Sequence, residues 1–148
     1  MAIKSFRGLI ADGGQDTIVL HTNDGSTGYR ITKFDIFPNK PGTAQSESTV
    51  QIFKIKQSSV STTTSEVDFN SPTLLAAGFY GKSAGVDNAE TKIILFDNEI
   101  FNQDIYITHT ETAGSESVNY YIELEQVKLD LNENTVATLK DIRNIASQ

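Results

Sequence analysis

The chain has 148 residues, with 12 Lys and Arg against 19 Asp and Glu, and it contains neither Cys nor Trp. A chain of this length supports one hydrophobic core, and the lack of Cys excludes disulfides, thiolate metal sites and cysteine nucleophiles. The net charge of -7 disfavours direct binding to nucleic acid or to an anionic membrane surface. No stretch reaches the roughly 20 apolar residues that cross a bilayer, so we expect one domain, 1–148, with no membrane contact.

Short segments with alternating apolar residues follow one another along the chain, separated by clusters of Gly, Asn, Asp, Ser and Pro. This pattern predicts an all-β fold. The predicted strands, in chain order, are 3–11, 17–22, 29–37, 49–56, 92–96, 104–110 and 118–129. Turn residues at 12–14 and 23–25 predict that the first three strands form hairpins or a meander.

Two of these strands change the phase of their alternation. In the third strand, Tyr29 and Ile31 share a face that Phe34 and Ile36 do not share, and in the last strand Val127 and Leu129 are out of phase with Tyr120, Ile122 and Leu124. A β-bulge near 32–33 and another near 125–126 would return each strand to a single buried face. The alternative is that both faces are buried there.

Two stretches lack a strand pattern. The polar tract 57–65 reads as a linker, an edge strand or a loop, and we favour a loop within the one domain. The region 70–88 reads as irregular, with Leu74, Leu75, Phe79 and Tyr80 placed between glycines. So much apolar surface on a loop packs on something, either the core or a neighbouring subunit.

The tail changes period, because Val136, Leu139, Ile142 and Ile145 recur every three residues. This spacing predicts an amphipathic helix over 132–146, with Arg143 toward the end where the helix dipole favours cations. The apolar stripe either packs on the protein's own sheet or docks on a partner chain.

The sequence offers little for catalysis. His21 and His109 are the only imidazoles, no Gly-x-Ser-x-Gly elbow is present, and the acidic turns do not match a calcium-binding loop. Phosphate-binding glycine loops are also missing from the sequence. We therefore expect no enzymatic activity, no metal site and no cofactor.

Five segments carry a resemblance to a known group of proteins. They read GYRITKF at 28–34, VQIFK at 50–54, FDNEIFNQDIYITHT at 96–110, NYYIELE at 119–125 and TLKDIR at 138–143. In these segments the chain resembles small virion structural proteins of marine tailed phages, of the kind that infect cyanobacteria and related ocean bacteria. The resemblance implies a capsid or tail component located in the virion, and it carries no catalytic motif.

The leading expectation is therefore a capsid decoration or cement protein. Its architecture would be an antiparallel β-sandwich, jelly-roll-like, with a C-terminal amphipathic helix, although a small barrel has the same sequence pattern. Its partners would be the major capsid protein or other virion proteins, together with further copies of itself. The expected contact residues are Leu74, Leu75, Phe79, Tyr80, Leu139, Ile142, Arg143 and Ile145.

Two other function classes stay open. The protein could be a tail or fibre-attachment component, present in far fewer copies than a shell protein. It could also be a glycan-binding module that uses its tyrosines and the segment 97–104. An enzyme is the most distant alternative.

Overall fold

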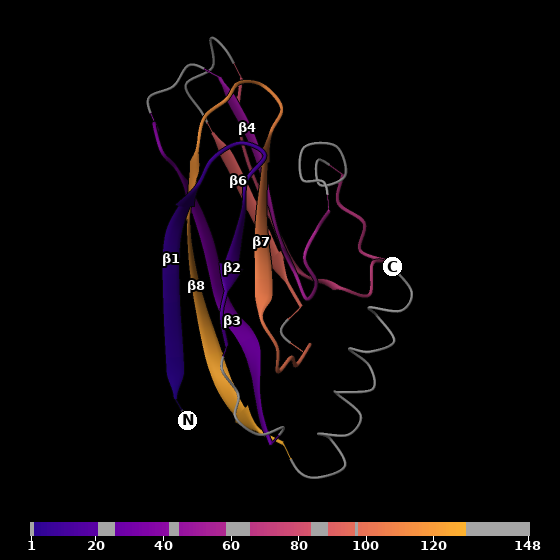
Figure 1. Ribbon diagram of the computed structural model, residues 1–148. Coiled ribbons are helices and arrows are strands. Elements are labelled where there is room, and N and C mark those ends of the chain that lie inside the picture. Colours follow the sequence, from indigo (N-terminus) through magenta and orange to yellow (C-terminus); the bar gives the residue numbers. More distant parts are fainter. Residues whose placement is uncertain are drawn as a thin grey trace.

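The chain folds into two antiparallel β-sheets that face each other (Figure 1). The computed structural model describes residues 2–20, 26–41, 45–58, 66–83, 89–96 and 98–129. The strands are β1 (Ile3–Ile10), β2 (Gln15–Ile18), β3 (Thr27–Pro38), β4 (Ser46–Phe53), β5 (Leu74–Lys82), β6 (Glu90–Leu95), β7 (Ile105–Glu111) and β8 (Val118–Lys128). One sheet has the order β1-β8-β3 and the other β2-β7-β4-β5-β6. The predicted all-β, sandwich-like fold is confirmed.

Period-two alternation explains why the two sheets share one core. Along β8, Val118, Tyr120, Ile122 and Leu124 are buried while the residues between them are partly exposed. These four side chains belong to the same buried cluster as Ile52 and Ile107 of the other sheet. Each sheet thus contributes its apolar face to a common interior, as expected when two sheets pack face to face.

The prediction that the first three strands form hairpins is wrong. β1 pairs with β8, whereas β2 pairs with β7, so the turn between them carries the chain from one sheet to the other. In this turn Gly13 has a φ of 76° and donates its N–H to the His109 carbonyl oxygen at 2.9 Å. A left-handed glycine permits a tight corner whichever sheet receives the next strand, so turn chemistry alone did not determine the pairing.

One of the two predicted bulges is present. The β3–β8 register shifts between Ile31 and Lys33, so the extra residue Thr32 brings the two halves of β3 onto one buried face. The bulge predicted near 125–126 is wrong, because β8 keeps a regular register there with both neighbours. Val127 is only partly buried, and Leu129 is buried just beyond the strand end, so the phase changes where the strand stops.

The prediction that 70–88 is irregular is also wrong over most of its length. Residues 74–82 form β5, which lies between β4 and β6 in the larger sheet. A strand in this position, with neighbours on both sides and few exposed side chains, reads as a nearly continuous apolar run and shows little alternation.

The outer face of the larger sheet is partly covered by the segments around the polar tract. Gln51 of β4 donates its side-chain amide to the Glu66 carbonyl oxygen at 3.2 Å, and Gln15 and Gln57 exchange hydrogen bonds of 3.1 and 2.8 Å. The predicted tract 57–65 and the predicted helix 132–146 lie largely or wholly outside the described residues. Over the described ranges, no helix is long and apolar enough to cross a membrane.

Candidate functional site

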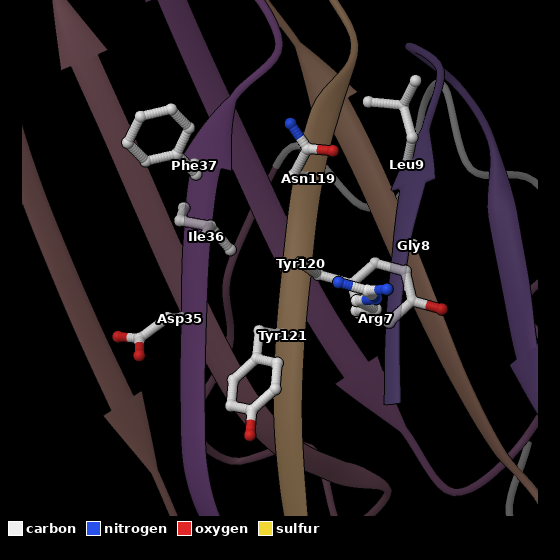
Figure 2. Close-up of a pocket in the computed structure, with 9 residues that line it drawn as sticks. All are labelled: Arg7, Gly8, Leu9, Asp35, Ile36, Phe37, Asn119, Tyr120 and Tyr121. Atoms are coloured by element: carbon white, nitrogen blue, oxygen red, sulfur yellow. The ribbon is translucent and has the colours of Figure 1, made fainter. Parts of the chain in front are cut away.

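The outer face of the three-stranded sheet presents a defined arrangement of side chains that no other described layer covers. Consecutive strand residues alternate between the core and the solvent, so the odd-numbered residues of β1 and β8 project outward there. We call this surface the three-strand face; Figure 2 shows its members, Arg7, Leu9, Asp35, Phe37, Asn119 and Tyr121.

An apolar row crosses this face at one end. The register places Asn119 of β8 directly beside Leu9 of β1 on one side and Phe37 of β3 on the other. Leu9 is 53% exposed and Phe37 is 61% exposed. These side chains are held by ordered strands rather than by a loop, so their apolar surface is presented in a fixed geometry.

A polar row lies next to it. Tyr121 is flanked by Arg7 and Asp35 in the same register. The Tyr121 hydroxyl donates to Glu123 Oε2 at 2.7 Å, and because only the protonated phenol can donate this bond, it raises the Tyr121 pKa above its ordinary value. The Lys33 ammonium lies 5.7 Å from the centre of the Tyr121 ring, within range of a cation–π interaction.

The two rows line a shallow hollow of about 520 Å³. Its walls combine aromatic and aliphatic surface with one amide, one carboxylate and one guanidinium. This composition is suited to binding, since a polar group beside an apolar side chain fixes the orientation of a partner. Within the described ranges, no group of three or more His, Asp or Glu residues is placed to hold a metal ion.

The most elaborate buried polar cluster lies at the opposite side of the core, around Glu111 of β7. Its carboxylate accepts hydrogen bonds from the Ser46 and Ser48 hydroxyls at 2.9 and 3.0 Å, from the Glu47 main-chain N–H, and from the Ala113 N–H at 3.4 Å. Because each donor comes from β4 or from the turn after β7, the cluster joins these elements. Its carboxylate oxygens are directed at these protein donors, which indicates a structural role.

His109 belongs to the same region and is fully buried. Its Nδ1 donates to the Ile10 carbonyl oxygen at 3.0 Å, which connects β7 to β1 in the other sheet. Burial lowers the His109 pKa below its ordinary value of 6.5, although Glu111 and Asp12 act in the opposite direction. The imidazole is thus held neutral between the sheets, where it fastens the corner that follows β1.

The predicted contact residues fall in three groups. Leu74, Leu75 and Tyr80 are buried in the protein's own core, which is one of the two alternatives given for this segment, but they belong to a strand rather than a loop and are not exposed to a partner. Phe79 projects from the outer side of β5 and is 39% exposed, so it remains available to a partner. The helix residues Leu139, Ile142, Arg143 and Ile145 lie outside the described residues.

The residues proposed for glycan contact are also separated by the fold. Tyr120 faces the core, where its hydroxyl donates to Asp16, while Tyr121 projects from the three-strand face. Asp104, directly before β7, accepts the Leu20 N–H at 2.8 Å and so holds the segment that follows β2. Asp104 thus makes a contact within the fold, and of these residues Tyr121 is the one exposed on the three-strand face.

Leu9 and Phe37 were missed by the sequence reasoning, although a signal was present. Each is directly adjacent to a buried isoleucine, Ile10 or Ile36, so two consecutive apolar residues occur in a strand that alternates elsewhere. In an alternating strand one member of such a pair must face outward.

No protein-family model matches the chain, and no curated protein matches it either.

Proposed function

We propose that the protein is a non-enzymatic structural protein of a phage virion, and specifically a decoration or cement protein that docks on the head shell. The observation that carries the docking step is the three-strand face, where Leu9 and Phe37 expose apolar side chains on a sheet that no other described layer covers. The resemblance of the sequence to small virion proteins supports a capsid or tail component, and we place this protein on the shell as the first of these two hypotheses.

We also propose the finer fold, a jelly roll. A jelly roll forms when a long antiparallel hairpin of eight strands is rolled up, which brings the first strand beside the last. The pairs β1–β8, β2–β7 and β4–β5 are three rungs of such a hairpin, and β3 lies against β6 across the interior. Both capsid and lectin domains use this fold, so it supports contact functions as a class without choosing between them.

Docking would operate through repetition. A single contact built on two exposed side chains is weak, but a symmetric shell offers the same contact many times, and linked copies gain from one another. Under this proposal the predicted helix residues Leu139, Ile142, Arg143 and Ile145 supply further contacts, whereas Phe79 projects from the other sheet and takes no part in this contact.

The test is a paired substitution on the three-strand face. Leu9→Asp with Phe37→Asp should leave folding intact, because both side chains already face solvent, and should abolish binding to undecorated shells. The matched control is Ile94→Asp on β6, where the side chain is 49% exposed on the other sheet. The control should bind shells like the parent protein, and binding by the double variant would contradict the proposal.

The glycan-binding alternative has a specific observation of its own. The hollow in Figure 2 places the Tyr121 ring beside the Asn119 amide, the Asp35 carboxylate and the Arg7 guanidinium, which are groups able to stack on a sugar ring and bond its hydroxyls. Binding to a glycan array that is lost in Tyr121→Ala would support this reading. Shell binding with no glycan response would exclude it.

The tail or fibre-attachment alternative differs in partner and copy number. It predicts binding to isolated tails rather than to shells, at a stoichiometry set by the tail's symmetry.

A further inference from the structure

The four sheet edges in the described chain differ in how well they are protected against pairing with another strand. β2 is only four residues long, and β6 has six residues and carries exposed Glu90 and Lys92. β3 has the bulge at Thr32 and ends in Pro38. Short strands, charges, bulges and prolines are the features that keep edges from pairing.

β1 is the exception. It runs for eight residues with no proline and no register shift, and it lies at the margin of the three-stranded sheet (Figure 1). Of its two cations, Lys4 is turned toward β3, since its ammonium donates to the Tyr29 hydroxyl at 3.2 Å, and Arg7 lies beside Tyr121 on the three-strand face. β1 is therefore the least protected of the edges.

The direction of the main-chain groups along β1 follows from one hydrogen bond. Gln126 donates its N–H to the Ala2 carbonyl oxygen at 2.9 Å, and the register places these two residues opposite each other. Because hydrogen-bonded pairs alternate along an antiparallel ladder, the even-numbered residues of β1 bond to β8. The N–H and C=O groups of Ile3, Ser5, Arg7 and Leu9 consequently point away from the sheet.

We propose that β1 of one copy pairs antiparallel with β1 of a second copy, about a two-fold axis that passes through Phe6. The two three-stranded sheets then join edge to edge into one continuous sheet. A second copy is the occupant that fits best, because this edge is complementary to itself: Ile3 and Leu9 lie at equal distances along the strand from Phe6, and both are 53% exposed.

The register follows from the same observations. Centring on Phe6 pairs Ile3 with Leu9 and Ser5 with Arg7, which uses all four outward-facing residues of each strand and forms about eight main-chain hydrogen bonds. A register centred on Ser5 or on Arg7 uses only three residues of each strand, for about six bonds. Centring on Arg7 also sets two guanidinium groups against each other.

In the proposed dimer the side chains of these four residues all lie on the outer side of the sheet. Ile3 of each copy lies beside Leu9 of the other, so the facing sides of these two side chains are buried at both ends of the seam while their outer surface stays exposed on the three-strand face. Arg7 faces Ser5, and no like charges are opposed. The joined sheet would display two three-strand faces side by side.

Cysteine pairs test the dimer and its register together. The chain has no Cys, so any disulfide must come from the introduced residues. Opposite residues in a hydrogen-bonded antiparallel pair have Cα atoms about 5.5 Å apart, within disulfide range. Under a mild oxidant the double variant Ser5→Cys with Arg7→Cys should form a covalent dimer, whereas each single variant should not.

Every outcome of this experiment bears on the proposal. A covalent dimer from Ser5→Cys alone or from Arg7→Cys alone would overturn the register. A single cysteine cross-links to its own copy only when the two-fold axis passes through that residue rather than through Phe6. Failure of the double variant to cross-link, with a monomer in sedimentation equilibrium at the same concentration, would overturn the dimer itself.

A proline variant provides a second readout. The Ser5 N–H points to the free edge, so Ser5→Pro removes a donor from the seam and none from the β1–β8 ladder. We expect it to keep a β-sheet circular dichroism spectrum and to raise the dimer dissociation constant by about tenfold, because two donors are lost per dimer. Ser5→Ala should dimerise like the parent, and a folded Ser5→Pro variant that dimerises equally well would contradict the proposal.

The cysteine experiment decides the matter if Ser5→Pro fails to fold. Because both measurements use the protein without shells, their failure would leave the proposed decoration role untouched.

Discussion

Replacing Glu111 with alanine tests the claim that the polar cluster of β7 is structural. Glu111 is 6% exposed, and its carboxylate accepts bonds from the hydroxyls of Ser46 and Ser48 and from two main-chain N–H groups. The substitution removes the acceptor and leaves all four donors in place. Since Ser46 and Ser48 are themselves buried, their hydroxyls are the donors with least access to water.

The expected loss can be worked from these contacts. A buried donor left without an acceptor costs about 1–3 kcal/mol. Two buried serine hydroxyls, together with the Glu47 N–H, therefore predict a decrease of about 3–5 kcal/mol in the free energy of unfolding. Water that enters the space vacated by the carboxylate can accept some of these hydrogen bonds, so the expected loss is smaller than three times the largest cost of a single donor.

The matched control is Glu47→Ala, the same change at the neighbouring cluster residue. Glu47 is exposed, and its carboxylate accepts only the exposed Thr112 hydroxyl in the described hydrogen bonds, at 2.9 Å. It should change the free energy of unfolding by about 0.5 kcal/mol or less. Urea unfolding followed by circular dichroism measures both, and a Glu111→Ala value within about 1 kcal/mol of the control would refute the reasoning.

Three further predictions concern stability. Burial lowers the His109 pKa, so the unfolded state binds the proton more readily below pH 6.5 and the free energy of unfolding should fall with decreasing pH, by at most about 1.4 kcal/mol per pH unit. His109→Asn, which keeps a donor for the Ile10 carbonyl, should flatten this dependence in urea unfolding between pH 7 and 5; an unchanged slope would contradict it. Gly8→Ala should cost about 1–3 kcal/mol in thermal unfolding, because the added Cβ would lie 2.7 Å from the Tyr120 ring, whereas Gly114→Ala, with its nearest neighbour at 3.9 Å, should change little. Deleting Thr32 should abolish cooperative unfolding, since it removes the bulge that aligns β3, while Thr32→Ala should fold; a folded deletion variant would show that β3 realigns without the extra residue.

The sequence pattern predicted those strands whose burial alternates. The phase change between Ile31 and Phe34 has only a few local solutions, so the bulge at Thr32 could be placed to within a residue. The similar change of phase after Leu124 comes from the end of the strand rather than from a bulge. The spacing of apolar residues alone does not distinguish a bulge from a strand end.

β5 was missed because its environment removes the signal. Seven consecutive residues from Leu74 to Tyr80 are hydrophobic or Gly, and only Phe79 among them is exposed. A strand that is buried on both sides resembles an apolar loop when read from sequence, and the glycines at 78 and 81 strengthened that reading. Gly78 instead lies where packing is tight, since a Cβ there would be 3.1 Å from the Phe34 ring.

Strand order could not be read from the sequence, because pairing between the two ends of the chain leaves no local trace. β1 and β8 are more than 100 residues apart and yet adjacent. The three-strand face depends on this pairing, since it brings Leu9, Asn119 and Phe37 into one row. The sequence could therefore predict that Leu9 and Phe37 face outward, but it could not predict that they lie in one row on the same face.

We propose above that this protein attaches to a phage head through the three-strand face. The most direct measurement is the number of copies that bind per undecorated shell, for the parent protein and for the Leu9→Asp, Phe37→Asp double variant. We expect the parent protein to saturate at a multiple of the number of capsomers and the folded variant not to bind. Equal binding by both proteins, or no binding by either, would contradict it.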